Sequence, residues 1–145
     1  MSEKWDKRFM ELANHVANWS KDPSTKVGCV IVRPDKTIAS VGYNGFPRGV
    51  DDDEQRYEDR EIKYLIVKHA EENAVYSAKE PLSGYTAYVT HHPCSTCAGT
   101  LIQNGISRVV TTIPDKYLYE RFKKSFDVTD IIFRESGVLL DFLER

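Results

Sequence analysis

The sequence contains no long apolar run, no marked excess of charge and few cysteines, and each absence excludes a class of protein. No stretch approaches the about 20 apolar residues that cross a bilayer, and the charged start MSEKWDKRFM has no apolar core of signal-peptide length. We therefore expect a cytoplasmic protein without a membrane partner. Lys and Arg number 20 against 22 Asp and Glu, so no positive field favours polymeric nucleic acid as a partner.

The three cysteines include one CxxC pair. Thiols stay reduced in the cytoplasm, so such a pair is more typical of a metal site or a redox site than of a disulfide. The length of 145 residues, with 41% hydrophobic residues, predicts one compact domain over residues 1–145 with its own core.

Helical and strand patterns alternate along the chain without internal repeats, which predicts an α/β fold with helices on both faces of a sheet of about five strands. A long polar stretch over 44–60 is predicted to be a functional or mobile loop. We expect helices over 5–19, 62–79, 94–105, 116–126 and 129–137, and strands over 26–34, 36–43, 84–90, 106–113 and 138–142.

The segments HAEENA and PCSTC carry the chemistry. Cys94 and Cys97 stand three apart where Pro93 indicates a helix start, so their side chains share a face and the helix terminus favours thiolate. With one histidine they give three zinc ligands and leave the fourth position to water, as hydrolytic zinc sites do. Glu71 reaches the same pocket if it lies with His69 in the first turn of a helix. Taken alone, the CxxC also fits a redox pair or half of a structural zinc site.

Two further residues are read as structural. Cys29 lies inside an apolar strand pattern without a His or Cys at ligand spacing, so we expect a buried core residue. His15 lies within the first predicted helix and is expected on its surface.

HAEENA together with YVTHHPCSTCA resembles the zinc-dependent cytidine deaminase superfamily. KDPSTKVGCVIV and SVGYNGFPRGVDD resemble its deoxycytidylate (dCMP) deaminase branch, so the resemblance runs from about Asp22 to Ser107. It implies a three-layer α/β/α sandwich with a mixed five-stranded sheet. It also implies one catalytic Zn²⁺ held by His69, Cys94 and Cys97, with Glu71 moving protons from water to the cytosine ring and the leaving amine. The implied reaction converts dCMP to dUMP and ammonia.

The resemblance also implies where the substrate binds, although a capped loop or ordinary packing would explain several of the same residues. Asn44 corresponds to a position near the sugar, and Tyr117, or less favourably Tyr119, would stack on the base or only pack. The expected substrate-binding residues are Ser24, Thr25, Lys26, Asn44, Ala70 and Tyr117.

The segment GYNGFPRG is not needed for zinc chemistry. It fits an ordinary strand exit in which Asn-Gly supplies positive φ, but its glycines and Arg48 also suit phosphate oxygens. In the dCMP deaminases it is linked to activation by dCTP and inhibition by dTTP, with Mg²⁺ able to accompany a bound triphosphate. The resemblance further implies a homohexamer. The predicted effector-binding residues are Gly42, Tyr43, Asn44, Gly45 and Arg48.

His91 and His92 depart from the apolar or small pair that the family usually has before PC. They would support the metal ligands, bind a second metal, contact a phosphate, or be ordinary surface histidines.

Other functions stay open. A tRNA adenosine deaminase would need a basic surface, a free cytidine or guanine deaminase would not need GYNGFPRG, and a noncatalytic zinc module would leave Glu71 without a role.

Overall fold

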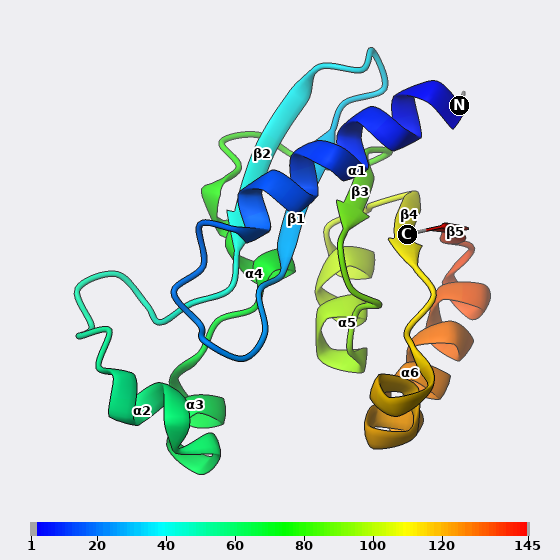
Figure 1. Ribbon diagram of the computed structural model, residues 1–145. Helices are drawn as coiled ribbons and strands as arrows, with labels where there is room; N and C mark the ends of the chain where they lie inside the picture. The colour runs from blue at the N-terminus through cyan, green and yellow to red at the C-terminus, as the bar shows by residue number, and fades with distance from the viewer. Residues whose placement is uncertain (1–2, 145) are drawn as a thin grey trace.

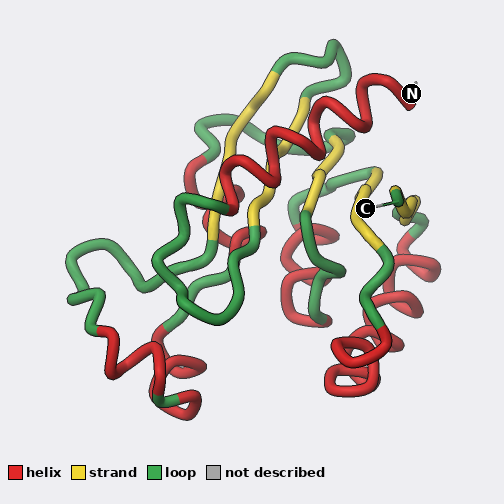
Figure 2. Tube along the Cα trace, in the orientation of Figure 1, coloured by secondary structure: helices red, strands yellow, loops and turns green. Residues whose placement is uncertain are grey.

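The computed structural model describes residues 3–144, and its centre is a five-stranded mixed sheet (Figures 1 and 2). The strand order is β2-β1-β3-β4-β5, with β1 antiparallel to both β2 and β3 and with β3, β4 and β5 mutually parallel along the sheet. The strands are β1 (Gly28–Val32), β2 (Ile38–Tyr43), β3 (Thr86–Val89), β4 (Arg108–Thr112) and β5 (Leu139–Leu143).

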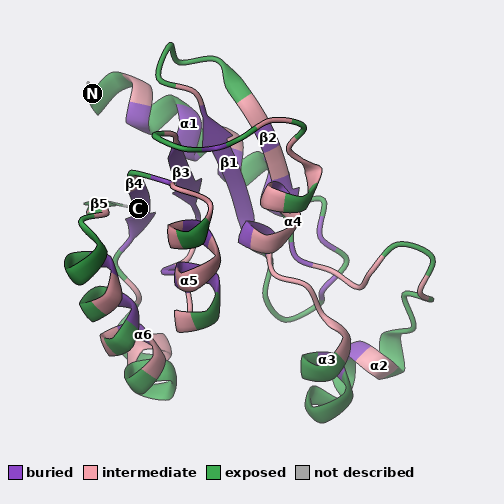
Figure 3. Ribbon diagram, turned by 180° about the vertical axis from the view of Figure 1, so that it is seen from behind, coloured by how far each residue is buried: buried purple, intermediate pink, exposed green. Residues whose placement is uncertain are grey.

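Helices cover both faces of this sheet. Helix α1 packs across β1, β2 and β3 on one face, whereas α4, α5 and α6 lie behind the sheet in Figure 1 and in front of it in Figure 3. The predicted three-layer α/β/α sandwich is therefore confirmed. The helices are α1 (Glu3–Ala17), α2 (Glu54–Glu58), α3 (Arg60–Ile66), α4 (Ala70–Ser77), α5 (Ser95–Gln103) and α6 (Lys116–Ser136).

The central strands are buried on both faces, which explains their nearly continuous apolar sequence. In β1, Cys29 and Ile31 join the core beneath α4 and α5, while Val30 and Val32 join the core beneath α1. Successive side chains of a strand point to opposite faces, so each strand contributes to two separate hydrophobic clusters. Cys29 is the buried core residue that its surroundings in the sequence predicted.

The predicted loop over 44–60 is wrong in part, because α2 and the start of α3 fall within it or at its end. Two aspartates begin these short helices: Asp53 accepts a hydrogen bond from the Gln55 N–H, and Asp59 accepts one from the Ile62 N–H. The acidic run over 51–54 therefore contains a helix cap at Asp53.

Two predicted helix boundaries are also wrong. The helix expected over 62–79 is interrupted at 67–69, and the two helices expected after β4 form one helix, α6, with non-helical backbone at Phe122. None of the helices among residues 3–144 is long and apolar enough to span a bilayer.

Candidate metal centre

The interruption between α3 and α4 places His69 at the N-cap of α4. A two-stranded bridge between Gly45 and Lys68 holds this segment in extended conformation, with N–H to O distances of 2.8 and 3.1 Å. The Glu72 carboxylate accepts a hydrogen bond from the His69 N–H at 2.8 Å and closes the first turn. His69 and Glu71 therefore occupy neighbouring positions at one helix end, as their separation by two residues requires.

Cys94 is the N-cap of α5, and Cys97 lies buried in the first turn of the same helix. The Ala98 N–H donates to the Cys94 carbonyl at 2.9 Å, which fixes the start of the helix. The N-termini of α4 and α5 thus present the histidine and both thiols to the same space, where the positive helix ends favour anionic ligands.

The three donor atoms fit a tetrahedral metal. His69 Nδ1 lies 3.2 Å from Cys97 Sγ and 3.5 Å from Cys94 Sγ, and all three donors lie within 4.8 Å of one another. Tetrahedral zinc with its usual bond lengths would hold such nitrogen and sulfur atoms about 3.5 Å apart. Among the residues described, this is the one group of at least three His, Cys, Asp or Glu side chains with such geometry.

The electrostatics of the cluster favour a thiolate at Cys94. Hydrogen bonding from Cys97, together with His69, lowers the pKa of Cys94 to about 4 despite burial. The hydrogen bond between His69 and Cys94 raises the pKa of His69 to about 9. The hydrogen bond between Cys97 and Cys94 raises the pKa of Cys97 as well. The metal-free cluster therefore retains protons that metal binding must displace.

Glu71 lies in the first turn of α4 and is 4% exposed. Burial raises the pKa of its carboxyl to about 7. The side chain lines a pocket of about 620 Å³ together with His69 and Cys94. The arrangement places a buried carboxyl, which can take up and release a proton, next to the three donor side chains and to space for a small molecule.

Five of the six predicted substrate residues line this pocket, namely Ser24, Thr25, Asn44, Ala70 and Tyr117. The structure does not bring Lys26 into it, because the Lys26 ammonium donates to the Ser20 carbonyl at 2.7 Å.

Asn44 has a structural task in the pocket wall. Its Oδ1 accepts a hydrogen bond from the Val27 N–H at 2.8 Å, and its Nδ2 donates to the Thr25 carbonyl at 2.9 Å. Asp22 and Lys63 form a buried ion pair of 2.7 Å beside it. These contacts hold the segment between α1 and β1 against the pocket.

The predicted effector residues lie close together in sequence but have different surroundings. The position of a Cβ on Gly42 is occupied by α4, 2.3 Å from the Ala74 nitrogen, so packing accounts for this glycine. The Tyr43 carbonyl accepts a hydrogen bond from Asn73, and Gly45 bridges to Lys68. Positive φ falls at Gly49 rather than at the Asn-Gly pair. Arg48 is exposed.

The two unusual histidines have separate positions. His91 lines the pocket, and its Nδ1 lies 3.3 Å from Thr90 Oγ1. His92 also lines the pocket, but it is buried and contacts Asp130 of α6. Tyr119 does not line this pocket, and its hydroxyl donates to Asp127. His15 is exposed on α1 and contacts Trp19 just beyond the end of that helix.

Sequence reasoning missed several pocket residues. Arg60, Lys63 and Tyr64 come from α3, while Arg121 and Phe126 come from α6. No motif distinguishes these residues from the other charged and aromatic residues on the same helices. The start of α3 at Arg60 is the one feature of this region that the sequence could have indicated.

A histidine, two thiols and a buried carboxyl around one pocket define the class: a metal-dependent hydrolytic site on an α/β/α frame. Residues 3–113 match the family model for the cytidine and deoxycytidylate deaminase zinc-binding region. The chain belongs to this family, and the predicted membership is confirmed.

Individual relatives agree with this assignment. The chain is 45% identical over 143 residues to the uncharacterized deaminase in luxG 3′ region of Aliivibrio fischeri, covering 99% of this chain and 96% of the relative. It is 39% identical over 143 residues to deoxycytidylate deaminase of Mus musculus, covering 93% and 77%. The dCMP deaminase of cyanophage S-TIM5, solved with dCMP and dUMP, shares the fold with a TM-score of 0.76 and 22% identity, covering 99% of both chains.

Proposed function

We propose that this protein catalyses hydrolytic deamination of dCMP to dUMP with release of ammonia. The observation that carries the proposal is the buried Glu71 carboxyl beside the His69, Cys94 and Cys97 cluster, in a pocket large enough for a nucleotide base and sugar. The name deoxycytidylate deaminase, carried by the mouse relative, supports the choice of substrate.

The residues of this chain have defined tasks in that reaction. Zinc bound by the three donor side chains would supply the Lewis acidity that activates water at neutral pH. The Glu71 carboxylate takes one proton from the attacking water and gives it to cytosine N3, and then takes the proton of the new C4 hydroxyl and gives it to the departing amine. A C–O bond forms at C4 and the C4–N bond breaks, so dCMP and water become dUMP and ammonia.

Cationic side chains in the pocket support a nucleotide substrate over a nucleoside. Lys63 is already paired with Asp22, so it is a poor candidate for a phosphate. Arg121 is exposed and donates to the Tyr64 hydroxyl at 3.2 Å, and Arg60 lines the same pocket. A guanidinium binds phosphate oxygens in a bidentate manner, which makes Arg121 our choice for the 5′-phosphate contact.

Ammonia release from dCMP, deoxycytidine, cytidine, dCTP and guanine tests the substrate. We expect turnover of dCMP well above that of either nucleoside, and equal activity on cytidine and dCMP would contradict the proposal. Arg121→Ala should raise the KM for dCMP by about 10-fold or more, because a charge-assisted hydrogen bond is lost, and should leave deoxycytidine turnover unchanged. Arg134→Ala, on the same helix but outside the pocket, is the matched control.

Regulation and assembly belong to the same proposal. We infer activation by dCTP and inhibition by dTTP at the segment 42–48, with Mg²⁺ accompanying the triphosphate, in a cytoplasmic homohexamer. The test is dCMP saturation with and without each triphosphate, in the wild type and in Arg48→Ala. An unmoved saturation curve in the wild type would remove the regulatory part and leave the catalytic proposal intact.

A further inference from the structure

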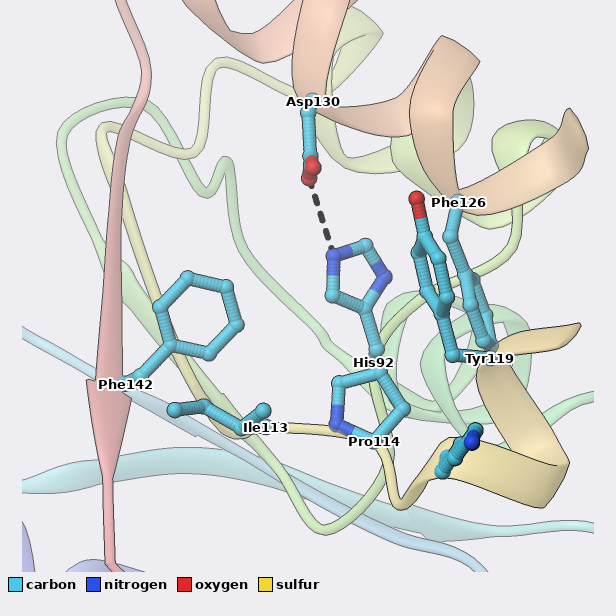
Figure 4. Close-up of a pocket in the computed structure, with 8 residues that line it drawn as sticks. His92, Ile113, Pro114, Tyr119, Phe126, Asp130 and Phe142 are labelled. Carbon is cyan, nitrogen blue, oxygen red and sulfur yellow. Dashed lines mark hydrogen bonds and ion pairs between the residues drawn. The ribbon is translucent and has the colours of Figure 1, made fainter. Parts of the chain in front are cut away.

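His92 lies in the wall between the substrate pocket and a second cavity of about 560 Å³ (Figure 4). His92 and Phe126 line both spaces. The His92 side chain is only 3% exposed although it carries two polar nitrogens. A buried imidazole needs defined partners, so its contacts show what holds this wall in place.

Asp130 is the partner that fixes the ring. Phe126 and Phe142 flank the imidazole, with ring centroids 4.6 and 5.9 Å away, and the ring lies between them in Figure 4. Its Nε2 lies 2.9 Å from the Asp130 carboxylate. The second cavity leaves open space beside the ring, so aromatic packing encloses the ring only in part and the contact with Asp130 adds a directional restraint on its orientation.

The other side of the ring reaches the metal-binding segment. His92 Nδ1 lies 3.0 Å from the Pro93 carbonyl, which also accepts a hydrogen bond from Thr129 Oγ1 at 3.0 Å. Two residues further along, the Ser95 N–H donates to Ser125 Oγ at 2.9 Å. Helix α6 therefore holds the chain on both sides of Cys94.

We propose that Asp130, acting through His92, is a positioning residue for Cys94 and for the shared wall of the substrate pocket. The inference rests on the proposed metal site. The Asp130 side chain is 49% exposed and touches neither the donor atoms nor the pocket that Glu71 lines. The contacts that lead from Asp130 to Cys94 run through the imidazole and the Pro93 carbonyl, in the way that partners of metal ligands orient those ligands.

Titration of the metal-free protein with cobalt(II) tests this without any substrate, since cobalt takes the ligands of zinc and absorbs visible light. In Asp130→Ala we expect the dissociation constant for cobalt to rise about 10-fold, with a changed thiolate-to-cobalt absorption band. The melting temperature should change little, because Asp130 is half exposed and adds little to the core. Asp130→Asn keeps an acceptor oxygen and should recover most of the affinity.

Asp127→Ala is the matched control, because Asp127 is also an aspartate of α6 with polar partners, Lys123 and Tyr119. We expect wild-type cobalt affinity in this variant. Wild-type affinity and spectrum in Asp130→Ala, or equal losses in the Ala and Asn variants, would overturn the positioning role. If the wild type itself failed to bind cobalt, the metal site and thus the proposed function would fail instead.

Discussion

At the scale of single residues, Glu71 offers the sharpest separation of metal binding from catalysis. Its carboxyl is buried beside the cluster but is not one of the three donors that lie together. Replacement by Gln keeps the shape of the side chain and removes its capacity to accept and return a proton.

We therefore expect Glu71→Gln to retain zinc and to lose at least about 10²-fold in kcat, the lower range for loss of general acid–base catalysis. Metal content and kcat are measured on the same preparation. Cys97→Ala is the complementary variant and should lose metal and activity together, because it removes a donor. Wild-type turnover in the Gln variant would show that another group moves the protons.

The residues of the metal site were predictable from the sequence because their chemistry restricts both type and spacing. Two thiols three apart at a helix start indicate a metal or redox site, and the resemblance of HAEENA and PCSTC to the deaminase family singled out His69 among the four histidines. The pocket cations Arg60 and Arg121 were not predictable. Each lies on a helix rich in charge, and only the packing of α3 and α6 around the pocket distinguishes it from its neighbours.

At the scale of helices and strands, the contact between β2 and α4 leaves no room for a side chain at Gly42. An added Cβ would lie 2.5 Å from the Ala70 carbonyl oxygen and 2.3 Å from the Ala74 nitrogen. Both are backbone atoms of the helix that carries Glu71, so the helix itself would have to move.

Gly42→Ala should therefore destabilise the protein by about 1–3 kcal/mol, the usual range for overpacking, and should lower kcat by displacing α4. Urea denaturation and kcat are the measurements. The control is Gly99→Ala in α5, where a Cβ meets no atom within 4 Å and the change should be neutral or mildly stabilising. Equal stability of the Gly42 variant and the wild type would mean that the contact relaxes easily.

Elements with a clear pattern were predicted well, and the errors lie where local signals are ambiguous. All five strands lie within their predicted ranges or extend one residue beyond them. The side chains of these strands point alternately into two hydrophobic clusters, which gives the sequence a strong apolar pattern. The sequence does not reveal the interruption of the helix at 67–69, because the helical pattern continues through these residues. A tertiary contact, the bridge from Gly45 to Lys68, causes the break.

At the scale of the whole molecule, two buried ion pairs tie distant parts of the chain together. Asp22 pairs with Lys63, and Asp6 of α1 pairs with Arg108 of β4. Burial alone would raise the pKa of Asp22, but hydrogen bonds from Lys63 and from the Ser24 and Thr25 backbone lower it below its usual value. The pKa of Asp6 is also lowered, because its bonds with Arg108 and Tyr88 outweigh burial.

A carboxyl whose pKa is lower in the folded protein stabilises the fold above the unfolded pKa of about 3.9 and loses that contribution as the pH falls through the folded value. The free energy of unfolding should therefore decline below about pH 4. Urea denaturation from pH 7 to pH 3 measures the decline. Asp22→Asn should lower the free energy of unfolding by about 3–5 kcal/mol at pH 7, because Lys63 stays buried without its partner. In this variant the free energy of unfolding should decline less steeply as the solution is acidified. An equally steep decline would assign the acid sensitivity to other groups.

Helix α6 supplies Arg121 and Phe126 to the pocket and also holds the chain on both sides of Cys94. One helix therefore links the wall of the pocket to the segment that carries two of the metal donors. A movement of α6 would change the shape of the pocket and the position of Cys94 together.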